Sequence, residues 1–173
     1  MTMDDELLSI VDENDQVIGQ RSRRTVHTLG LRHRAVHVLI FDRSARLFLQ
    51  KRSMHKDMNP GLWDSSAAGH VDAGESYDRC ALREIREELG VDVTSKLLPL
   101  FKLPASRRTG MEFCQVYRLI HGGPFRLNRE EITLGRWYDL EELDNWVKAD
   151  SDRLTDSFKE IWRTFRSKYT AIA

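Results

Sequence analysis

A chain of 173 residues with 40% hydrophobic and 31% charged side chains has the size and composition of one soluble globular domain. Its 27 Lys and Arg residues balance 27 Asp and Glu residues, which excludes an overall basic field for a nucleic acid polymer or an anionic membrane. The sequence has no apolar run of the ~18 residues that a membrane span needs and no signal peptide at the Met1 end, so we expect a cytoplasmic protein. Cys80 and Cys114 lack metal-binding spacing, which predicts two buried free thiols.

The first half of the chain alternates apolar runs with turn-forming residues. The polar cluster from Asp12 to Asp15 lies between two apolar runs and predicts an N-terminal hairpin over residues 7–21. The basic segment from Arg21 to Arg32 reads as an irregular connection. Further along, the pattern predicts strands over residues 33–41 and 46–51, a turn at Asn59-Pro60-Gly61 and an extended segment over residues 62–68.

A helix is expected after a glycine-bounded loop over residues 69–74. Ser76 is a good N-cap, and Asp78 suits the positive end of the helix dipole. Gly90 supplies the left-handed residue that commonly ends a helix. The expected apolar stripe, which must pack on the neighbouring strands, consists of Leu82, Ile85 and Leu89.

Three more strands and a C-terminal helix complete the expected elements. The strands cover residues 97–103, 113–120 and 134–138, and Gly122-Gly123-Pro124 breaks the chain between the last two. The C-terminal helix covers about residues 152–169, with an apolar face of Leu154, Phe158, Ile161, Trp162, Phe165 and Tyr169. This order predicts an α+β fold in which a mixed β-sheet is sandwiched between α-helices, with residues 1–173 as one domain.

Three acidic residues of the expected helix after Ser76 stand out. Glu84, Glu87 and Glu88 have i, i+3, i+4 spacing, which places them on one helix face. Their like charges repel by a few tenths of a kcal/mol per pair. A hard divalent cation such as Mg²⁺ would turn this repulsion into coordination, because it prefers carboxylate oxygens. The pattern therefore predicts a metal site that acts on phosphates, whereas acids that merely face water are the simpler alternative.

The segment from Gly69 to Val91, GHVDAGESYDRCALREIREELGV, resembles the Nudix box. Five residues separate Gly69 from Glu75, and seven more precede the run that starts at Arg83. The loop-to-helix context that such a motif requires is also predicted. The resemblance implies a Nudix fold and Mg²⁺- or Mn²⁺-dependent hydrolysis of a diphosphate linkage, usually in a nucleoside diphosphate derivative.

The helix geometry and the resemblance to the Nudix box together assign expected roles to these residues. Glu84, Glu87 and Glu88 are the expected metal ligands, and the carbonyl group of Ala68 or Gly69 is a candidate additional ligand. Either Glu87 or Glu88 is the candidate general base for an attacking water. Arg83 is within reach of Glu87 on the helix, but the resemblance implies that it pairs with Glu75 and holds the loop to the helix.

A subgroup of the family offers a rival function. The N-terminal hairpin and the segment from Arg46 to Trp63 resemble Nudix proteins that include the type 1 isopentenyl-diphosphate isomerases. These isomerases carry a catalytic cysteine where this chain has Ala68, so one of two proton-transfer groups is missing here. Glu112 matches their metal-binding glutamate, and His33 and His70 match their histidines, so the resemblance implies that part of their metal site remains.

Residues outside the box complete the candidate site. Arg52, in a basic cluster with Lys51 and Lys56, is a candidate clamp for a diphosphate, with a solvated surface cluster as the equal alternative. Glu131 stands where Nudix enzymes often place a carboxylate near the metal. The candidate substrate-binding residues are thus Arg52, His70, Glu112 and Glu131, while His33 and His37 read as structural histidines and Trp63, Trp137 and Trp162 as core.

The sequence supports one function and leaves two rivals. The leading prediction is a metal-dependent hydrolase of a small-molecule diphosphate, as a monomer or homodimer, without a nucleic acid polymer or membrane as partner. The rivals are an isopentenyl-diphosphate isomerase and a binding module that recognises a diphosphate without turnover. The intact box carboxylates favour catalysis, because a pure binding module needs no general base.

Overall fold

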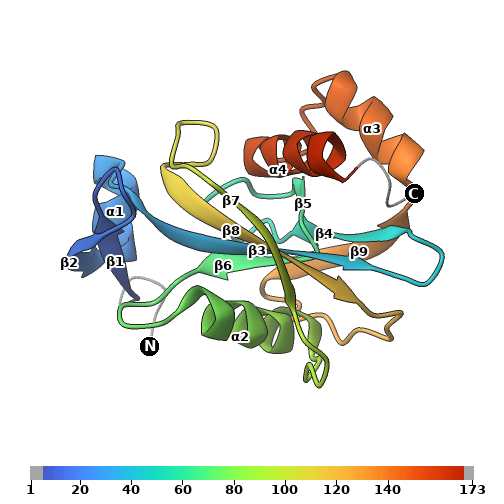
Figure 1. Cartoon of the computed structure of the whole chain (residues 1–173), viewed down its shortest axis with the longest axis horizontal. Coiled ribbons are helices and arrows are strands. Elements are labelled where there is room, and N and C mark those ends of the chain that lie inside the picture. The colour runs from blue at the N-terminus through green and yellow to red at the C-terminus, as the bar shows by residue number, and fades with distance from the viewer. Residues whose placement is uncertain (1–5, 170–173) are drawn as a thin grey trace.

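The computed structural model describes residues 6–169 (Figure 1). Its elements are, in chain order, β1 (Leu7–Val11), β2 (Val17–Ser22), α1 (Arg23–Leu29), β3 (His33–Phe41), β4 (Leu47–Arg52), β5 (Trp63–Asp64), β6 (Ala67–His70), α2 (Tyr77–Leu89), β7 (Leu98–Leu103), β8 (Glu112–Ile120), β9 (Ile132–Tyr138), α3 (Leu140–Lys148) and α4 (Asp156–Lys168). None of the helices in the described part of the chain is long and apolar enough to cross a membrane.

A seven-stranded mixed sheet forms the centre of the molecule. Its main path runs β5-β4-β3-β8-β7, while β6 pairs with β3 and β9 pairs with β4. The strands β3 and β8 are parallel, so that His33 lies opposite Glu112 although the chain between them is long. On its other side β3 pairs antiparallel with β6, which sets Ala68 opposite His37. The sheet thus places β6 and β8 on either side of β3, although the three strands are distant in sequence.

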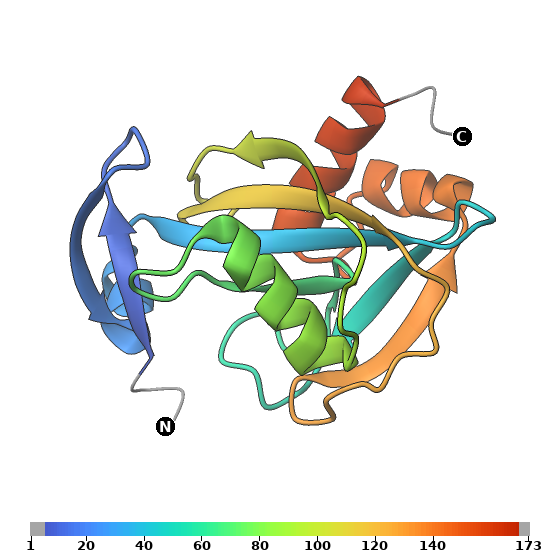
Figure 2. The ribbon, with the colours of Figure 1, turned by 60° about the horizontal axis from the view of Figure 1, so that its bottom comes forward.

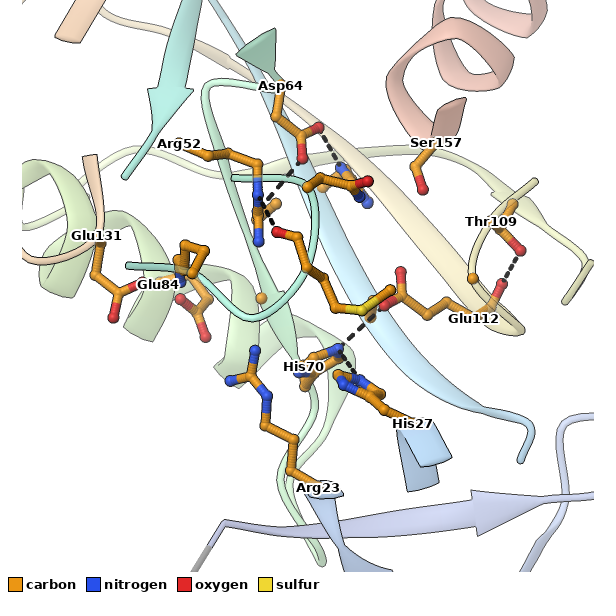
Figure 3. A pocket seen from close by; sticks show the side chains of 18 of the residues that line it. Arg23, His27, Arg52, Asp64, His70, Glu84, Thr109, Glu112, Glu131 and Ser157 are labelled. Carbon is orange, nitrogen blue, oxygen red and sulfur yellow. Dashed lines mark hydrogen bonds and ion pairs between the residues drawn. The ribbon is translucent and has the colours of Figure 1, made fainter. Parts of the chain in front are cut away.

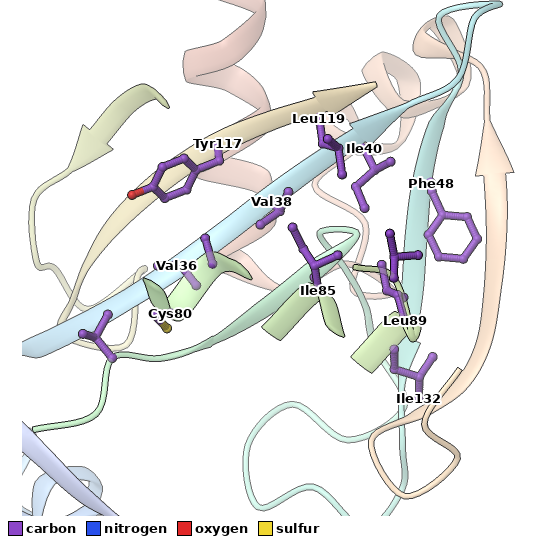
Figure 4. Close-up of a cluster of buried hydrophobic side chains, with 14 residues drawn as sticks. Val36, Val38, Ile40, Phe48, Cys80, Ile85, Leu89, Tyr117, Leu119 and Ile132 are labelled. Carbon is purple, nitrogen blue, oxygen red and sulfur yellow. The ribbon is translucent and has the colours of Figure 1, made fainter. Parts of the chain in front are cut away.

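Helices cover both faces of the sheet, as predicted. Side chains alternate between the faces along a strand. On β3, Val36, Val38 and Ile40 face α2 and join the cluster of Figure 4, together with Ile85 and Leu89 of the helix. The intervening residues of β3 face a second cluster, to which α3 and α4 contribute Leu143, Val147, Phe158, Ile161, Trp162 and Phe165. The α/β/α arrangement is confirmed, and Cys80 and Cys114 are both buried and free.

A two-stranded sheet of β1 and β2 stands with α1 at one end of the main sheet (Figure 2). Asp15, in the turn of this hairpin, fixes its position. Its carboxylate accepts hydrogen bonds from Arg34 Nε at 2.7 Å, from the Tyr77 hydroxyl at 3.0 Å and from Lys102 Nζ. These donors belong to β3, α2 and β7, so one charge-assisted cluster ties the hairpin to three elements of the main body.

One helix lies where the sequence suggested an irregular connection. The segment from Arg23 to Leu29 is the helix α1. Ser22 caps its first turn through a hydrogen bond from the Thr25 N–H, and Gly30 ends it in the left-handed conformation. The prediction failed because this short helix buries only Val26 and so has no apolar periodicity, although both caps are readable in the sequence.

The helix α2 begins after Ser76 and ends at Gly90 as predicted, but its buried stripe is shifted. Leu82 is 42% exposed, and the stripe runs instead through Ala81, Ile85 and Leu89. The prediction followed apolar residues alone, whereas the fold turns the acidic face partly inward beside this stripe.

The C-terminal region also differs in detail from the prediction. Thr155 caps α4, so the helix starts at Asp156, a few residues later than expected. The segment after β9 forms a further helix, α3, which the sequence analysis left unassigned. Trp63 and Trp162 are buried and Trp137 packs against the core, as expected for structural aromatic residues.

Candidate active site

The box helix lies very close to the strand β6. A Cβ atom added to Gly69 would lie 2.1 Å from the carboxyl carbon of Glu84. Real Cβ contacts are never that short, so only glycine allows the carboxylate of α2 to lie against the backbone of β6. The first glycine of the box is therefore required for the position of Glu84.

Arg83 joins the loop to the helix. Its Nε donates to Glu75 Oε1 at 3.0 Å and its second terminal nitrogen to Glu75 Oε2 at 2.9 Å, which is the bidentate pair implied by the family resemblance. The same guanidinium donates to Glu84 at 2.6 Å, to Glu87 at 3.2 Å and to the His70 carbonyl at 3.0 Å. Both alternatives for Arg83 therefore occur together, and its donors are fully used within the protein.

The three acids of the box differ in their environments. Glu84 is 9% exposed and Glu88 is 2% exposed, whereas Glu87 is about half exposed. Burial, followed by the charge of Glu88, raises the pKa of Glu84, and burial likewise raises the pKa of Glu88. Two buried carboxylates side by side are incompletely neutralised by the protein, so a divalent cation fits this donor set.

A cavity of about 510 Å³ opens over these acids (Figure 3). It collects nearly all predicted site residues, namely Arg52, Ala68, Gly69, His70, Arg83, Glu84, Glu87, Glu88, Glu112 and Glu131. Glu75 is not among the residues that line the cavity and acts through Arg83. Figure 3 places Glu84 and Glu131 on one side of the cavity and His27, His70 and Glu112 on another.

Basic side chains of the cavity are held by neighbouring acids. Arg52 donates through Nε to the Met58 carbonyl at 3.1 Å and lies 3.5 Å from Asp64. Lys56, for which the sequence suggested only membership of a basic cluster, is largely buried in an ion pair with Glu131. Arg52 and Lys56 are therefore part of the cavity wall, whereas Lys51 does not line it.

An imidazole cluster occupies the other side of the cavity. His70 Nε2 lies 3.0 Å from Glu112 Oε1 and 3.3 Å from His27 Nε2, and His33 Nε2 lies 3.5 Å from the same Glu112 oxygen. Burial alone would raise the pKa of Glu112, but hydrogen bonds with His33 and His70 outweigh it and hold this pKa well below its usual range. The ligand atoms of the three histidines lie within 4.8 Å of one another, as one metal ion requires.

Two histidines of this cluster, His27 and His33, are not among the site residues that the sequence predicts. His27 has no role in the sequence analysis, because the match to the isomerases slips by a residue in this segment. His33 matches an isomerase histidine but is favoured as a structural residue, and the structure places it in the cluster. His37 has the expected structural contacts, since its Nδ1 lies 2.9 Å from the Ser65 hydroxyl. Gln50 and Asp64 were also missed, because each is defined by partners that are distant in sequence.

Comparison with known proteins is consistent with this geometry. The NUDIX domain family model matches residues 31–158, and the chain belongs to this family. An uncharacterized Nudix hydrolase of Streptomyces coelicolor is 46% identical over 145 residues, covering 83% of this chain and 80% of the relative. The isopentenyl-diphosphate Delta-isomerase of Serratia proteamaculans is 33% identical over 162 residues, covering 92% and 90%.

A solved structure agrees with the fold. The crystal structure of DR0079 from Deinococcus radiodurans matches with a TM-score of 0.82 and 30% sequence identity, covering 92% of this chain and 98% of that one. The predicted Nudix fold and the predicted subgroup, which includes both hydrolases and isomerases by name, are thus confirmed.

The close approach at Gly69 gives a first test. Gly69→Ala must displace the Glu84 carboxylate, so we expect a loss of divalent-ion affinity of about tenfold or more. Titration calorimetry with Mn²⁺ measures this. Gly122→Ala is the matched control, because a Cβ there meets nothing within 4 Å and its affinity should equal that of the wild type. Equal Mn²⁺ affinity in the two variants would contradict the assigned position of Glu84.

The raised pKa of Glu84 gives a second test, in the presence of a chelator. Because the pKa rises from 4.5 to about 8 on folding, the bound proton stabilises the fold fully below about pH 4.5, and this contribution is lost as the pH rises to about 8. Glu84→Gln removes that dependence. We expect its melting temperature to exceed that of the wild type by a few degrees near pH 8 and the difference to shrink toward pH 5.

The exposed Glu130→Gln variant is the control for this measurement, with a difference from the wild type that does not change with pH. If the difference in melting temperature between Glu84→Gln and the wild type is also independent of pH, then burial does not raise the pKa of Glu84 in the folded protein. Saturating Mn²⁺ should reverse the order, because the ion binds the charged carboxylate.

Proposed function

We propose that this protein is a metal-dependent hydrolase that cleaves a diphosphate linkage in a small molecule, such as a nucleoside diphosphate derivative. The observation that supports it best is the buried pair of Glu84 and Glu88 on a cavity that also presents Arg52 and Lys56. Acids that hold a cation and bases that face the same space suit a substrate with a chain of phosphoryl groups.

Each box residue has a distinct task in this proposal. Glu84, Glu87 and Glu88, with the carbonyl of Ala68, would hold Mg²⁺ or Mn²⁺. When bound, such an ion offsets charge on the phosphoryl oxygens and lowers the pKa of water. Glu75 and Arg83 keep the loop and helix in register, since their bidentate pair spans both.

Outside the box, the proposal uses side chains from several elements of the cavity. Arg52 would orient the diphosphate, and Glu131, which Lys56 holds in an ion pair, would lie near the ion. The same cavity includes His70 and Glu112, which we place on the substrate side.

Glu88 is the better candidate for the general base, with Glu87 as the alternative. Its pKa is raised by burial toward neutrality, which suits proton transfer near pH 7. Only its Oε2 accepts hydrogen bonds from described residues, and the residue borders the cavity. In this proposal, Glu88 accepts a proton from the attacking water as the oxygen of that water bonds to phosphorus and the bridging oxygen leaves.

The isomerase alternative is weaker on two observations. Ala68 has no proton to give at the position where the isomerases carry a cysteine. The described cavity is lined mainly by polar and charged residues, with Ala35, Met58 and Ala68 as the few non-histidine apolar residues beside glycines. An isoprenyl group would therefore meet few apolar side chains there.

The test is incubation with Mg²⁺ and a panel of nucleoside diphosphate compounds plus isopentenyl diphosphate, with product identification by mass spectrometry. Glu88→Gln should lose activity by about 10²-fold or more while retaining substrate binding. Glu141→Gln, an exposed acid of α3, should keep wild-type rates. A loss of only a few-fold in Glu88→Gln would contradict the role of Glu88.

The panel also separates the rivals. Phosphate-containing fragments support the hydrolase. Conversion of isopentenyl diphosphate to its isomer without cleavage would instead establish the isomerase, and tight binding without turnover of any compound would establish a binding module.

The imidazole cluster supports a second ion. We propose that His27, His33, His70 and Glu112 hold it; the resemblance to the isomerases covers His33, His70 and Glu112, and the geometry of the cluster adds His27. Calorimetry with Mn²⁺ should then find two sites in the wild type and one in His70→Ala. His55→Ala removes an exposed loop imidazole and should keep both. Identical stoichiometry in His70→Ala and the wild type would refute this second site.

A further inference from the structure

Gln50 of β4 is a polar side chain that is completely buried. It lies on β4 two residues after Phe48, and alternation along a strand points both side chains to the same face. Phe48 packs in the apolar cluster that faces α2. Gln50 is the first of three polar residues that end the strand, Gln50-Lys51-Arg52, but unlike the other two it is completely buried, with 0% exposure. A buried polar group in an apolar layer needs a compensating partner.

The partner is the acid at the end of the box. Gln50 Nε2 donates to Glu88 Oε2 at 2.9 Å, across 38 positions of sequence. The same oxygen accepts the Ala68 N–H at 3.0 Å. One carboxylate oxygen is thus held by two donors from two different strands, β4 and β6. This fixes the plane of the carboxylate and leaves Oε1, for which no donor occurs among the described residues.

The amide oxygen of Gln50 shows which contact holds the side chain in its orientation. Its Oε1 is buried and has no hydrogen-bond partner in the described structure. An unsatisfied buried carbonyl oxygen costs about 1–3 kcal/mol. Turning the amide over would set this oxygen against Glu88 Oε2 and remove the donor. The amide is therefore held by its charge-assisted hydrogen bond to the carboxylate, which is roughly twice as strong as a neutral one.

We propose that Gln50 is a positioning residue that aims Glu88 at the cavity. It acts only through Glu88: it clamps Oε2 and so presents Oε1 toward the space where the ion and the water would bind. The inference rests on the proposed function, because it assigns a partner to an acid of that same site. It also explains why a glutamine is completely buried at this position.

The test compares two equivalent substitutions. Gln50→Met keeps the length of the side chain and removes the donor, whereas Gln115→Met makes the same change on β8, where the amide donates to the Phe101 carbonyl. Calorimetry should find Mn²⁺ affinity reduced by about 10–100-fold in Gln50→Met and unchanged in Gln115→Met. With the substrate found by the panel, kcat should fall more than KM changes.

A double-mutant cycle separates aiming from general packing. In the Glu88→Gln background, Gln50→Met should cause no further loss of Mn²⁺ affinity, because the group on which Gln50 acts is already altered. A purely structural role would give the same loss in both backgrounds. If Gln50→Met does not fold, as judged by thermal denaturation, Gln50→Asn is used; it keeps an amide but withdraws it from Glu88, and the same loss is expected.

Wild-type Mn²⁺ affinity and kcat in Gln50→Met would overturn this inference while the proposed function stands. Absence of Mn²⁺ binding or of diphosphate cleavage in the wild type would instead overturn the proposed function, and the inference with it.

Discussion

The candidate active site depends on two carboxylates that the fold buries beside each other. Glu84 and Glu88 would prefer water, and their burial is possible because Ile85 and Leu89 on the same helix pack into the apolar layer under the sheet. Gly69 removes the Cβ that would collide with Glu84, so the acids and the apolar stripe are buried together. The raised pKa values of the acids record the cost of this arrangement.

Much of the fold around the candidate site could be predicted from the sequence, because its causes are local. Ser76 and Gly90 mark the ends of α2 by capping, which needs no knowledge of the rest of the chain. The strands carry their own periodicity, and the box fixes the residues from Gly69 to Arg83 relative to one another. Gln50 begins the polar end of its strand, Gln50-Lys51-Arg52, so neither its burial nor its partner could be inferred from the strand alone.

What the sequence could not provide was the pairing of distant segments. The parallel register of β3 and β8 brings His33 to Glu112, and α1 adds His27 from a third segment. Nothing local selects that register, because it follows from the packing of both sheet faces at once. Leu82 is a second example of a feature that depends on the whole fold. Its apolar character suggested burial, but α2 turns its acids inward, and Leu82 is consequently exposed to solvent.

Like Arg83, other cationic side chains around the cavity already have acidic partners within the protein. The hydrogen-bond donors of Arg83 are already used within the protein. Four other cationic side chains of the cavity form ion pairs, namely Arg23 with Glu6 and Asp57, Arg52 with Asp64, Lys56 with Glu131 and Arg108 with Glu160. Long-range attraction of a bare polyanion is consequently weak, since paired charges cancel beyond a few ångströms. Under the proposed function, a diphosphate already complexed with a divalent cation loses less from this weak attraction than a bare one, because its own charge is largely cancelled.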